Sequence, residues 1–252
     1  SEVKGTSELT GCAENHGAPS RRGFGSGICI DIISTDQSVP SRISSKLGKY
    51  RIVRVRSECR RGLLMSDESL PCWHVEFEES VLKTPIFEIF RVGARSALSA
   101  EKAGEFAVAR CPDWVNVVAV TDDEEIVFVE QYRHGCRSLT LEIPGGMVDA
   151  GEDMVTAGLR ELAEETGFTG EGAELIGVVM PNPAFQTNRC GTVLVRGVRR
   201  TQEPNLDPME EIRVLTFSRE EISTRISKGE IHHALVVAAF HHLTAWEALR
   251  RS

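Results

Sequence analysis

One short segment of the chain gathers acidic side chains at a spacing that suits a hard metal ion. From Gly146 to Phe168 the sequence reads GMVDAGEDMVTAGLRELAEETGF. If this segment is helical, Glu161, Glu164 and Glu165 lie on one side of the helix, because residues three and four apart share a face. Carboxylates at that spacing repel one another unless a cation lies among them. Crowded oxygen ligands suit Mg²⁺, which prefers carboxylates, waters and substrate phosphates.

The rest of the segment supports a helix that presents these carboxylates. Side chains that could pack on a core recur at helical spacing: Val155, Leu159, Leu162 and Thr166. Gly167 is expected to end the helix, and Arg160 can reach Glu164 one turn further on. The alternative is a solvated acidic face on an ordinary amphipathic helix, which is the usual meaning of a charge run. The complete spacing from Gly146 onward favours the metal site.

With every specified position filled, this segment resembles an intact Nudix box, the signature of hydrolases that cleave a nucleoside diphosphate linked to another moiety. The resemblance implies an α/β fold, namely an α/β/α sandwich with a mixed sheet, in which the box forms a strand-loop-helix unit. It also implies that the three box glutamates bind Mg²⁺ or Mn²⁺. Arg160 would orient those carboxylates, so the same four residues would be catalytic.

Sequence ahead of the box narrows the resemblance to one branch of the family. EQYRHG, followed by LEIPGG, resembles the branch that hydrolyses ADP-ribose and related nucleoside diphosphate sugars. That resemblance implies that Arg133 and Glu142 bind the substrate, Arg133 at the pyrophosphate, and that the Gly145 carbonyl is a further metal ligand. It also implies an N-terminal β-region that packs across a homodimer. The alternative for Arg133 is a surface residue that follows a strand.

The loop PNPAFQTNR, residues 181–189, lies where this branch carries a substrate-binding loop, although it lacks the usual glycines. Phe185 could stack on a base, and Asn188 or Arg189 could bind a hydroxyl or a phosphate. The alternative is that Phe185 only packs the loop.

Hydrolysis also needs a base that takes the proton of the attacking water. By resemblance this is an acidic residue on a late loop, so Glu210 is the first candidate and Glu211 the second, with Glu161 of the box as a third. The alternative for Glu210 and Glu211 is two solvated glutamates before a strand.

Charge and composition restrict the partners. Residues 1–64 carry eleven basic and six acidic residues, whereas the whole chain of 252 residues has a net charge of −8. The body is therefore strongly acidic and a poor non-specific nucleic-acid binder, so a small anionic substrate fits better. No run of eighteen apolar residues exists to span a membrane. The seven scattered cysteines argue against a disulfide scaffold or a zinc site and favour a reducing compartment, the cytoplasm.

The chain is expected to have three parts. Residues 1–64 are rich in serine and arginine and lack periodicity, so they are expected to be a disordered extension, either a transit segment or sequence upstream of a natural start at Met65. Residues 65–112 would form the N-terminal β-region, with strands from about Pro85 onward, and residues 113–252 the Nudix domain.

In that domain, Ser218 to Glu221 predicts a capping box, and a long helix is expected over about 231–249. The histidine pairs at 232–233 and 241–242 are expected on that helix as surface or interface residues, with metal binding as the alternative.

Two rival functions remain on the sequence alone. A Nudix hydrolase could act on coenzyme A, NADH, a dinucleoside polyphosphate or a capped RNA end, although the four-cysteine zinc module expected of the NADH-cleaving branch is absent. A non-catalytic Nudix module could bind a nucleotide sugar, but such modules usually lack a box glutamate or the arginine, and here all are present.

Overall fold

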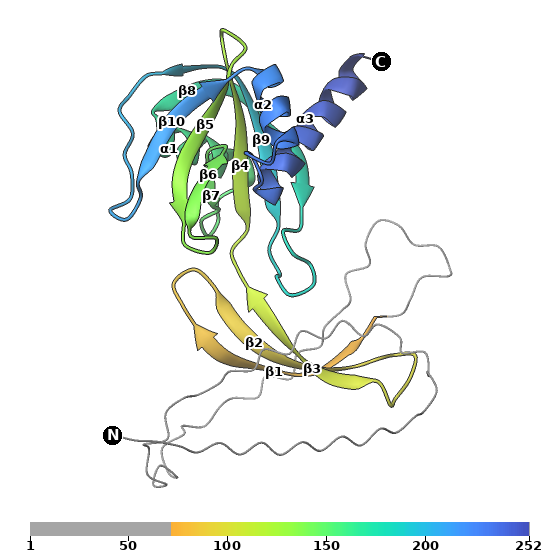
Figure 1. Cartoon of the computed structure of the whole chain (residues 1–252). Coiled ribbons are helices and arrows are strands. Elements are labelled where there is room, and N and C mark those ends of the chain that lie inside the picture. The colour runs from red at the N-terminus through yellow and green to blue at the C-terminus, as the bar shows by residue number, and fades with distance from the viewer. Residues whose placement is uncertain (1–71, 252) are drawn as a thin grey trace, which may run out of the picture. The chain divides into compact units, whose positions relative to one another are not determined.

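The structure, a computed structural model, describes residues 72–251, which form a three-stranded sheet, a seven-stranded sheet and three helices (Figure 1). The predicted disordered extension, residues 1–64, lies outside the described residues. No helix within 72–251 is both long and apolar enough to cross a bilayer. Cys111, Cys136 and Cys190 are free thiols, whereas Cys72 is disulfide-bonded, which the scattered spacing of the cysteines did not predict.

The first sheet is antiparallel, in the order β1–β2–β3, and consists of β1 (His74–Lys83), β2 (Glu88–Arg95) and β3 (Ala103–Arg110). It lies inside the range 65–112 that the sequence predicts to be β-structure. The sequence placed the first strand near Pro85 and so missed β1. Polar and apolar residues do alternate in its first residues, HVEFE, which is the signal of a half-buried strand.

The second sheet contains the remaining strands: β4 (Trp114–Thr121), β5 (Ile126–Arg133), β6 (Ser138–Glu142), β7 (Gly145–Met147), β8 (Phe168–Val179), β9 (Cys190–Arg200) and β10 (Ile212–Phe217). The main order is β10–β5–β4–β9–β8. β4 and β9 run parallel, and the other pairs are antiparallel, so the sheet is mixed as predicted.

Helices cover both faces of this second sheet (Figure 1). Along β4, Val117 and Ala119 join the core that α1 (Met154–Thr166) covers, while Val118 and Val120 join the core under α2 (Arg219–Ser227) and α3 (Ala234–Arg251). Successive side chains of a strand point to opposite faces, so a nearly unbroken apolar strand serves both cores. The prediction of an α/β/α sandwich is confirmed. The Ser218 capping box at the start of α2 is present too.

The second sheet opens between the neighbouring strands β4 and β5. β4 and β5 pair at Val120 and Ile126, and further along β6 pairs with β5 while β7 pairs with β4. The connection from β6 to β7 crosses this opening, where Val117 N–H donates to the Pro144 carbonyl at 2.8 Å. The β6–β7 connection therefore brings Glu142 and Gly145 to this opening, where β7 contacts α1.

Candidate active site

Local signals fix both ends of α1. The Asp153 carboxylate accepts hydrogen bonds from Val155 N–H (2.9 Å) and Thr156 N–H (3.0 Å), which satisfies two of the free donors at the helix start. Gly167 ends the helix with a φ of 73°, a conformation that glycine adopts without steric cost. Of the side chains predicted to face the core, Leu162 and Thr166 are fully buried, and Val155 and Leu159 pack beside them. Glu161 and Glu164 are partly exposed, whereas Glu165 is buried next to the packed face of the helix.

The first glycine of the box makes room for a carboxylate. A Cβ atom on Gly146, in β7, would overlap the carboxyl group of Glu161. β7 and α1 are thus in direct contact at this point, and only glycine lets the Glu161 side chain lie against the strand.

Arg160 organises the exposed side of the cluster. Its Nη1 donates to Glu161 at 2.8 Å and to Glu164 at 3.1 Å. Its other nitrogens hold Glu152, at 3.0 and 3.2 Å, and the Met147 carbonyl, at 2.9 Å. The guanidinium group thereby joins the loop before α1 to the helix, and its planar fork fixes the direction of each carboxylate.

Glu165 is the most buried of the box glutamates. Its side chain accepts a hydrogen bond from Gly145 N–H at 2.9 Å, and the residue is only 4% exposed. Burial, together with repulsion from Glu161 and Glu210, raises the pKa of Glu165 to about 8. Among residues 72–251 no salt bridge involves this carboxylate. A buried carboxyl group with acidic neighbours is stabilised in its charged form by a cation.

The donor set fits a hard divalent ion, although its members are not gathered into a ready-made site. Within 72–251 no three His, Cys, Asp or Glu side chains converge closely enough to hold one ion. Arg160 lies between Glu161 and Glu164 and keeps their carboxylates directed toward itself. Burial raises the pKa of Glu161 as well, and Glu164 and Glu210 add to the effect. Carboxylate oxygens with raised pKa values are the groups that a cation would stabilise.

Arg133 and Glu142 form a second cluster across the β5–β6 pair. Arg133 donates from Nε (2.8 Å) and Nη2 (2.7 Å) to the two oxygens of Glu142, and the Thr140 hydroxyl donates to one of them at 2.6 Å. Burial acts to raise the pKa of Glu142, but the hydrogen bonds from Arg133 and Thr140 outweigh it and hold the pKa below its usual value. Glu142 is 4% exposed, whereas the Arg133 side chain is 44% exposed. Glu142 therefore anchors Arg133, whose guanidinium group remains accessible.

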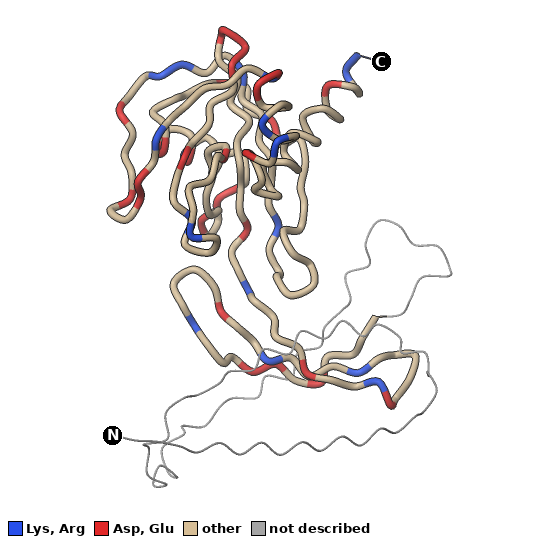
Figure 2. Tube along the Cα trace, in the orientation of Figure 1, with Lys and Arg blue, Asp and Glu red and all other residues tan. Residues whose placement is uncertain are grey.

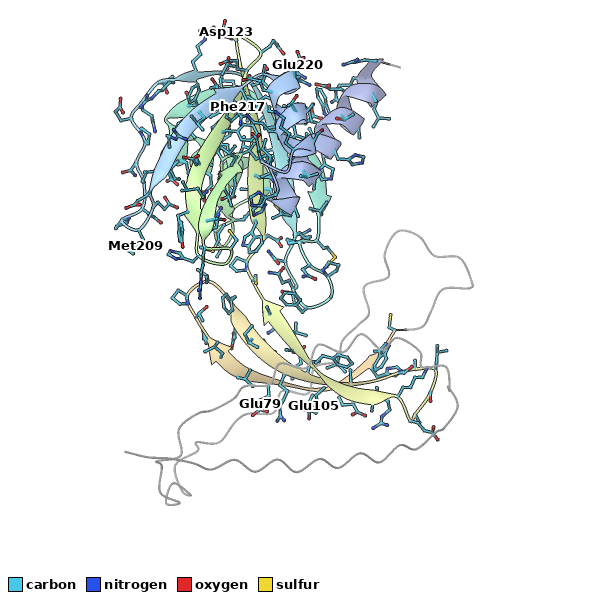
Figure 3. The ribbon with its side chains drawn as sticks, viewed as in Figure 1. Glu79, Glu105, Asp123, Met209, Phe217 and Glu220 are labelled. Carbon is cyan, nitrogen blue, oxygen red and sulfur yellow. The ribbon has the colours of Figure 1, made fainter. Side chains whose placement is uncertain are left out.

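The loop before β10 brings one predicted base toward this cluster. The charge of Glu210 acts on Glu161, Glu165 and Arg133. The loop is acidic, as the red segment there in Figure 2 shows, and Met209 at its tip points outward and is 93% exposed (Figure 3). Glu210 and Glu211 are both exposed, but Glu211 has no comparable effect on the three site residues.

A family match agrees with this geometry. The model of the NUDIX domain matches residues 112–240, more than half of the chain and the whole of the cluster just described. The chain belongs to the Nudix family. Among curated proteins it is 30% identical to an ADP-ribose pyrophosphatase of Bacillus subtilis over 59% of this chain and 81% of that protein. It is 29% identical to an ADP-sugar pyrophosphatase of Mus musculus over 66% of this chain and 77% of the relative.

Two further matches cover more of the Nudix chain. A methanol dehydrogenase activator of Bacillus methanolicus is 30% identical over 69% of this chain and 97% of its own. A crystal structure of an ADP compounds hydrolase superposes with a TM-score of 0.64 and 19% identity, over 73% of this chain and 98% of that one, which supports the fold. The predicted resemblance to the ADP-ribose branch is confirmed by the named relatives, and so is the prediction of a Nudix pyrophosphohydrolase.

The other predicted substrate residues lie on the loop between β8 and β9 of the Nudix domain. Phe185 is 47% exposed, and its carbonyl accepts from Ala109 N–H at 2.7 Å. The Arg189 guanidinium group is held by Asp113, with Nε at 3.1 Å and Nη2 at 2.5 Å, although the side chain is 60% exposed. Among the contacts within residues 72–251, none joins the side chain of Phe185 or Arg189 to Arg133 or to the box glutamates, so the role of both residues in binding remains a prediction.

Some functional contacts were not predicted. Glu152 is a partner of Arg160 and lies before the helix, since the N-cap is Asp153. Thr140 supports Glu142, and His233 Nε2 lies 3.9 Å from the same carboxylate. The spacing of the box could have indicated Glu152, because it is one of the specified positions. Nothing in the sequence around His233 indicated its neighbour, which is ninety-one positions away.

Proposed function

We propose that this Nudix protein hydrolyses the diphosphate of ADP-ribose or a related nucleoside diphosphate sugar, releasing a nucleoside monophosphate and a sugar phosphate. The observation that carries the proposal is the pairing of two clusters: the box carboxylates on α1, and an accessible Arg133 anchored by Glu142 beside them. Relatives named for ADP-ribose and ADP-sugar hydrolysis support this substrate class.

The box residues would hold Mg²⁺ or Mn²⁺. Glu161, Glu164 and Glu165 would supply carboxylate oxygens and Gly145 its carbonyl, while Arg160 keeps the outer carboxylates in position. When bound, a divalent ion neutralises charge on the diphosphate and makes a water more acidic. The chain itself contributes a group of buried carboxylates to ion binding. The raised pKa values of Glu161 and Glu165 indicate that their charged forms would be stabilised by a cation.

The remaining residues position the substrate and move one proton. Arg133 would bind the diphosphate oxygens through its fork of donors, held in direction by Glu142. Water attacks one phosphorus, the bond from that phosphorus to the bridging oxygen breaks, and the departing phosphate takes both electrons of that bond. Glu210 is the proposed base for the proton of the water, with Glu211 or Glu161 as alternatives, because its charge reaches Glu161, Glu165 and Arg133.

The test is a panel of diphosphate substrates with Mg²⁺ and with a chelator, in wild type and in Glu165→Gln. ADP-ribose and other nucleoside diphosphate sugars should be hydrolysed only with the metal. Glu165→Gln should lose divalent-ion binding and reduce kcat by at least about 100-fold, since it removes a buried ligand. Product analysis by chromatography and ion binding by calorimetry give the two readouts.

The matched control is Glu203→Gln, which changes a carboxylate whose side chain is 89% exposed. It should leave both readouts unchanged. Activity of Glu165→Gln within a few-fold of wild type would contradict the assignment, and preferential hydrolysis of coenzyme A, NADH or capped RNA would move it to another Nudix substrate.

A second candidate, activation of a dehydrogenase, is favoured by the relative of that name, because the match spans 97% of the relative. The same preparation can be added to a purified methanol dehydrogenase while alcohol oxidation is followed. Stimulation by wild type and equally by Glu165→Gln would indicate an action on the partner that is independent of hydrolysis.

A further inference from the structure

His233 lies immediately before the first residue of α3 and caps that helix. The His233 carbonyl accepts from Val237 N–H at 3.2 Å, the first bond of the helix. The side chain accepts as well: Leu235 N–H donates to His233 Nδ1 at 3.3 Å. A side-chain acceptor bonded to the second helical N–H is the usual arrangement of an N-cap residue.

This cap determines which ring nitrogen carries the proton. Nδ1 uses its lone pair to accept from the backbone, so the proton of the neutral imidazole is on Nε2. Nε2–H is therefore a donor whose direction is fixed by the start of α3. Within residues 72–251 it makes no hydrogen bond of its own.

His233 Nε2 lies beside the Arg133–Glu142 cluster. His233 Nε2 lies 3.9 Å from Glu142 Oε2, beyond hydrogen-bond distance. The same oxygen accepts from Arg133 Nη2 at 2.7 Å. The His233 side chain is 33% exposed and the Arg133 side chain is 44% exposed, so a ligand can reach both side chains.

We propose that His233 is a substrate-binding residue whose Nε2–H donates to an oxygen of the substrate next to the group held by Arg133. The proposal rests on the proposed hydrolysis of nucleoside diphosphate sugars. The acceptor is a phosphate or hydroxyl oxygen, and it lies on one of the two halves that become the products.

Two substitutions separate binding from helix capping. In His233→Asn the side-chain oxygen can still cap α3, but the shorter side chain no longer reaches the position of Nε2. In His233→Gln the amide nitrogen can occupy nearly the position of Nε2, but the cap at Nδ1 is lost. His232→Asn, at the exposed neighbouring residue, is the matched control.

One of the two variants should lose substrate affinity, and the other should lose thermal stability. His233→Asn should raise the KM for ADP-ribose by about 3- to 10-fold, which is the effect of losing one hydrogen bond. Its melting temperature should be unchanged. His233→Gln should keep the KM close to wild type and lower the melting temperature by about 2 to 4 °C. Calorimetric titration with AMP and with ribose 5-phosphate shows which product loses affinity, and so which half carries the acceptor.

An unchanged KM in His233→Asn, or a loss that His233→Gln does not rescue, overturns the proposal. A purely structural role predicts the reverse pattern, in which only His233→Gln is impaired. Wild-type protein that neither binds these products nor hydrolyses ADP-ribose contradicts the proposed function itself, and the inference about His233 fails with it. Normal wild-type hydrolysis with an unaffected His233→Asn contradicts the role of His233 alone.

Discussion

A single buried carboxylate, Glu142, determines where the accessible guanidinium group of Arg133 lies. Both oxygens of Glu142 are engaged by Arg133, and the Thr140 hydroxyl adds a third hydrogen bond. Residues that hold a binding group in this way reduce the conformational entropy that binding costs. Changes at Glu142 should therefore affect both stability and substrate affinity.

The pH dependence of that contribution follows from the lowered pKa of Glu142. A carboxyl group with a lowered pKa in the folded state stabilises the protein above its ordinary pKa, and the stabilisation is lost as pH falls through the lowered value. Glu142→Gln should therefore lower the free energy of unfolding by about 2 kcal/mol at pH 7, or the melting temperature by about 4 to 8 °C.

Thermal unfolding of wild type and Glu142→Gln between pH 7 and pH 3 checks this, and the difference between them should shrink toward the acidic end. Glu101→Gln, at an exposed carboxylate between β2 and β3, serves as the control. A difference that stays constant across this pH range would show that Glu142 acts through packing and not through its charge.

At the scale of elements, the contact between β7 and α1 brings the carboxylates to the edge of the sheet. Gly146→Ala would place a Cβ where the Glu161 carboxyl group lies. Because a flexible side chain can move aside, the fold should survive with a stability change below about 1 kcal/mol. Affinity for the divalent ion and kcat should fall by about 10-fold or more, since Glu161 is displaced.

Gly135→Ala provides the comparison, because a Cβ there would meet no atom within 4 Å. Metal titration and steady-state kinetics on both variants give the measurement. Equal activity in the two variants would mean that the Glu161 position is not critical.

Elements whose signals are local were predictable from the sequence. The C-terminal end of α1 at Gly167 and the acidic face of the helix follow from residues within one or two turns, and the capping box at Ser218 is likewise a four-residue signal. The strand β1 was missed because its alternation is short and interrupted. The anchoring of Arg133 needed the β5–β6 register, and the position of His233 needed the packing of α3, which no local pattern contains.

At the scale of the whole molecule, a network of ion pairs ties α3 to the rest of its domain. Glu247 on α3 is 17% exposed and pairs with Arg219 at the start of α2 (2.6 Å), with Arg196 on β9 (3.7 Å) and with Arg251 (3.6 Å). One carboxylate shared by three arginines contributes more than an isolated surface pair, because its loss leaves the arginines to repel one another.

Glu247→Gln should therefore lower the melting temperature by about 2 to 4 °C at low ionic strength, and less in 1 M salt, which screens the charges. Hydrolytic activity should be unchanged, since within the described part of the chain the charged partners of Glu247 are these arginines and not residues of the box. Glu203→Gln, which removes an exposed i,i+3 pair, should have no measurable effect. An effect on melting that does not depend on salt would point to packing as the cause.

The loop that carries Phe185 is held by hydrogen bonds to Ala109 and Asp113, which precede β4. The Ala109 N–H and carbonyl bond the backbones of Phe185 and Thr187, and Asp113 holds Arg189. The conformation of this loop therefore depends on residues outside it. A graft of residues 181–189 between relatives, made to transfer substrate preference, would have to include residues 109–113, because hydrogen bonds between the two segments hold the loop in place.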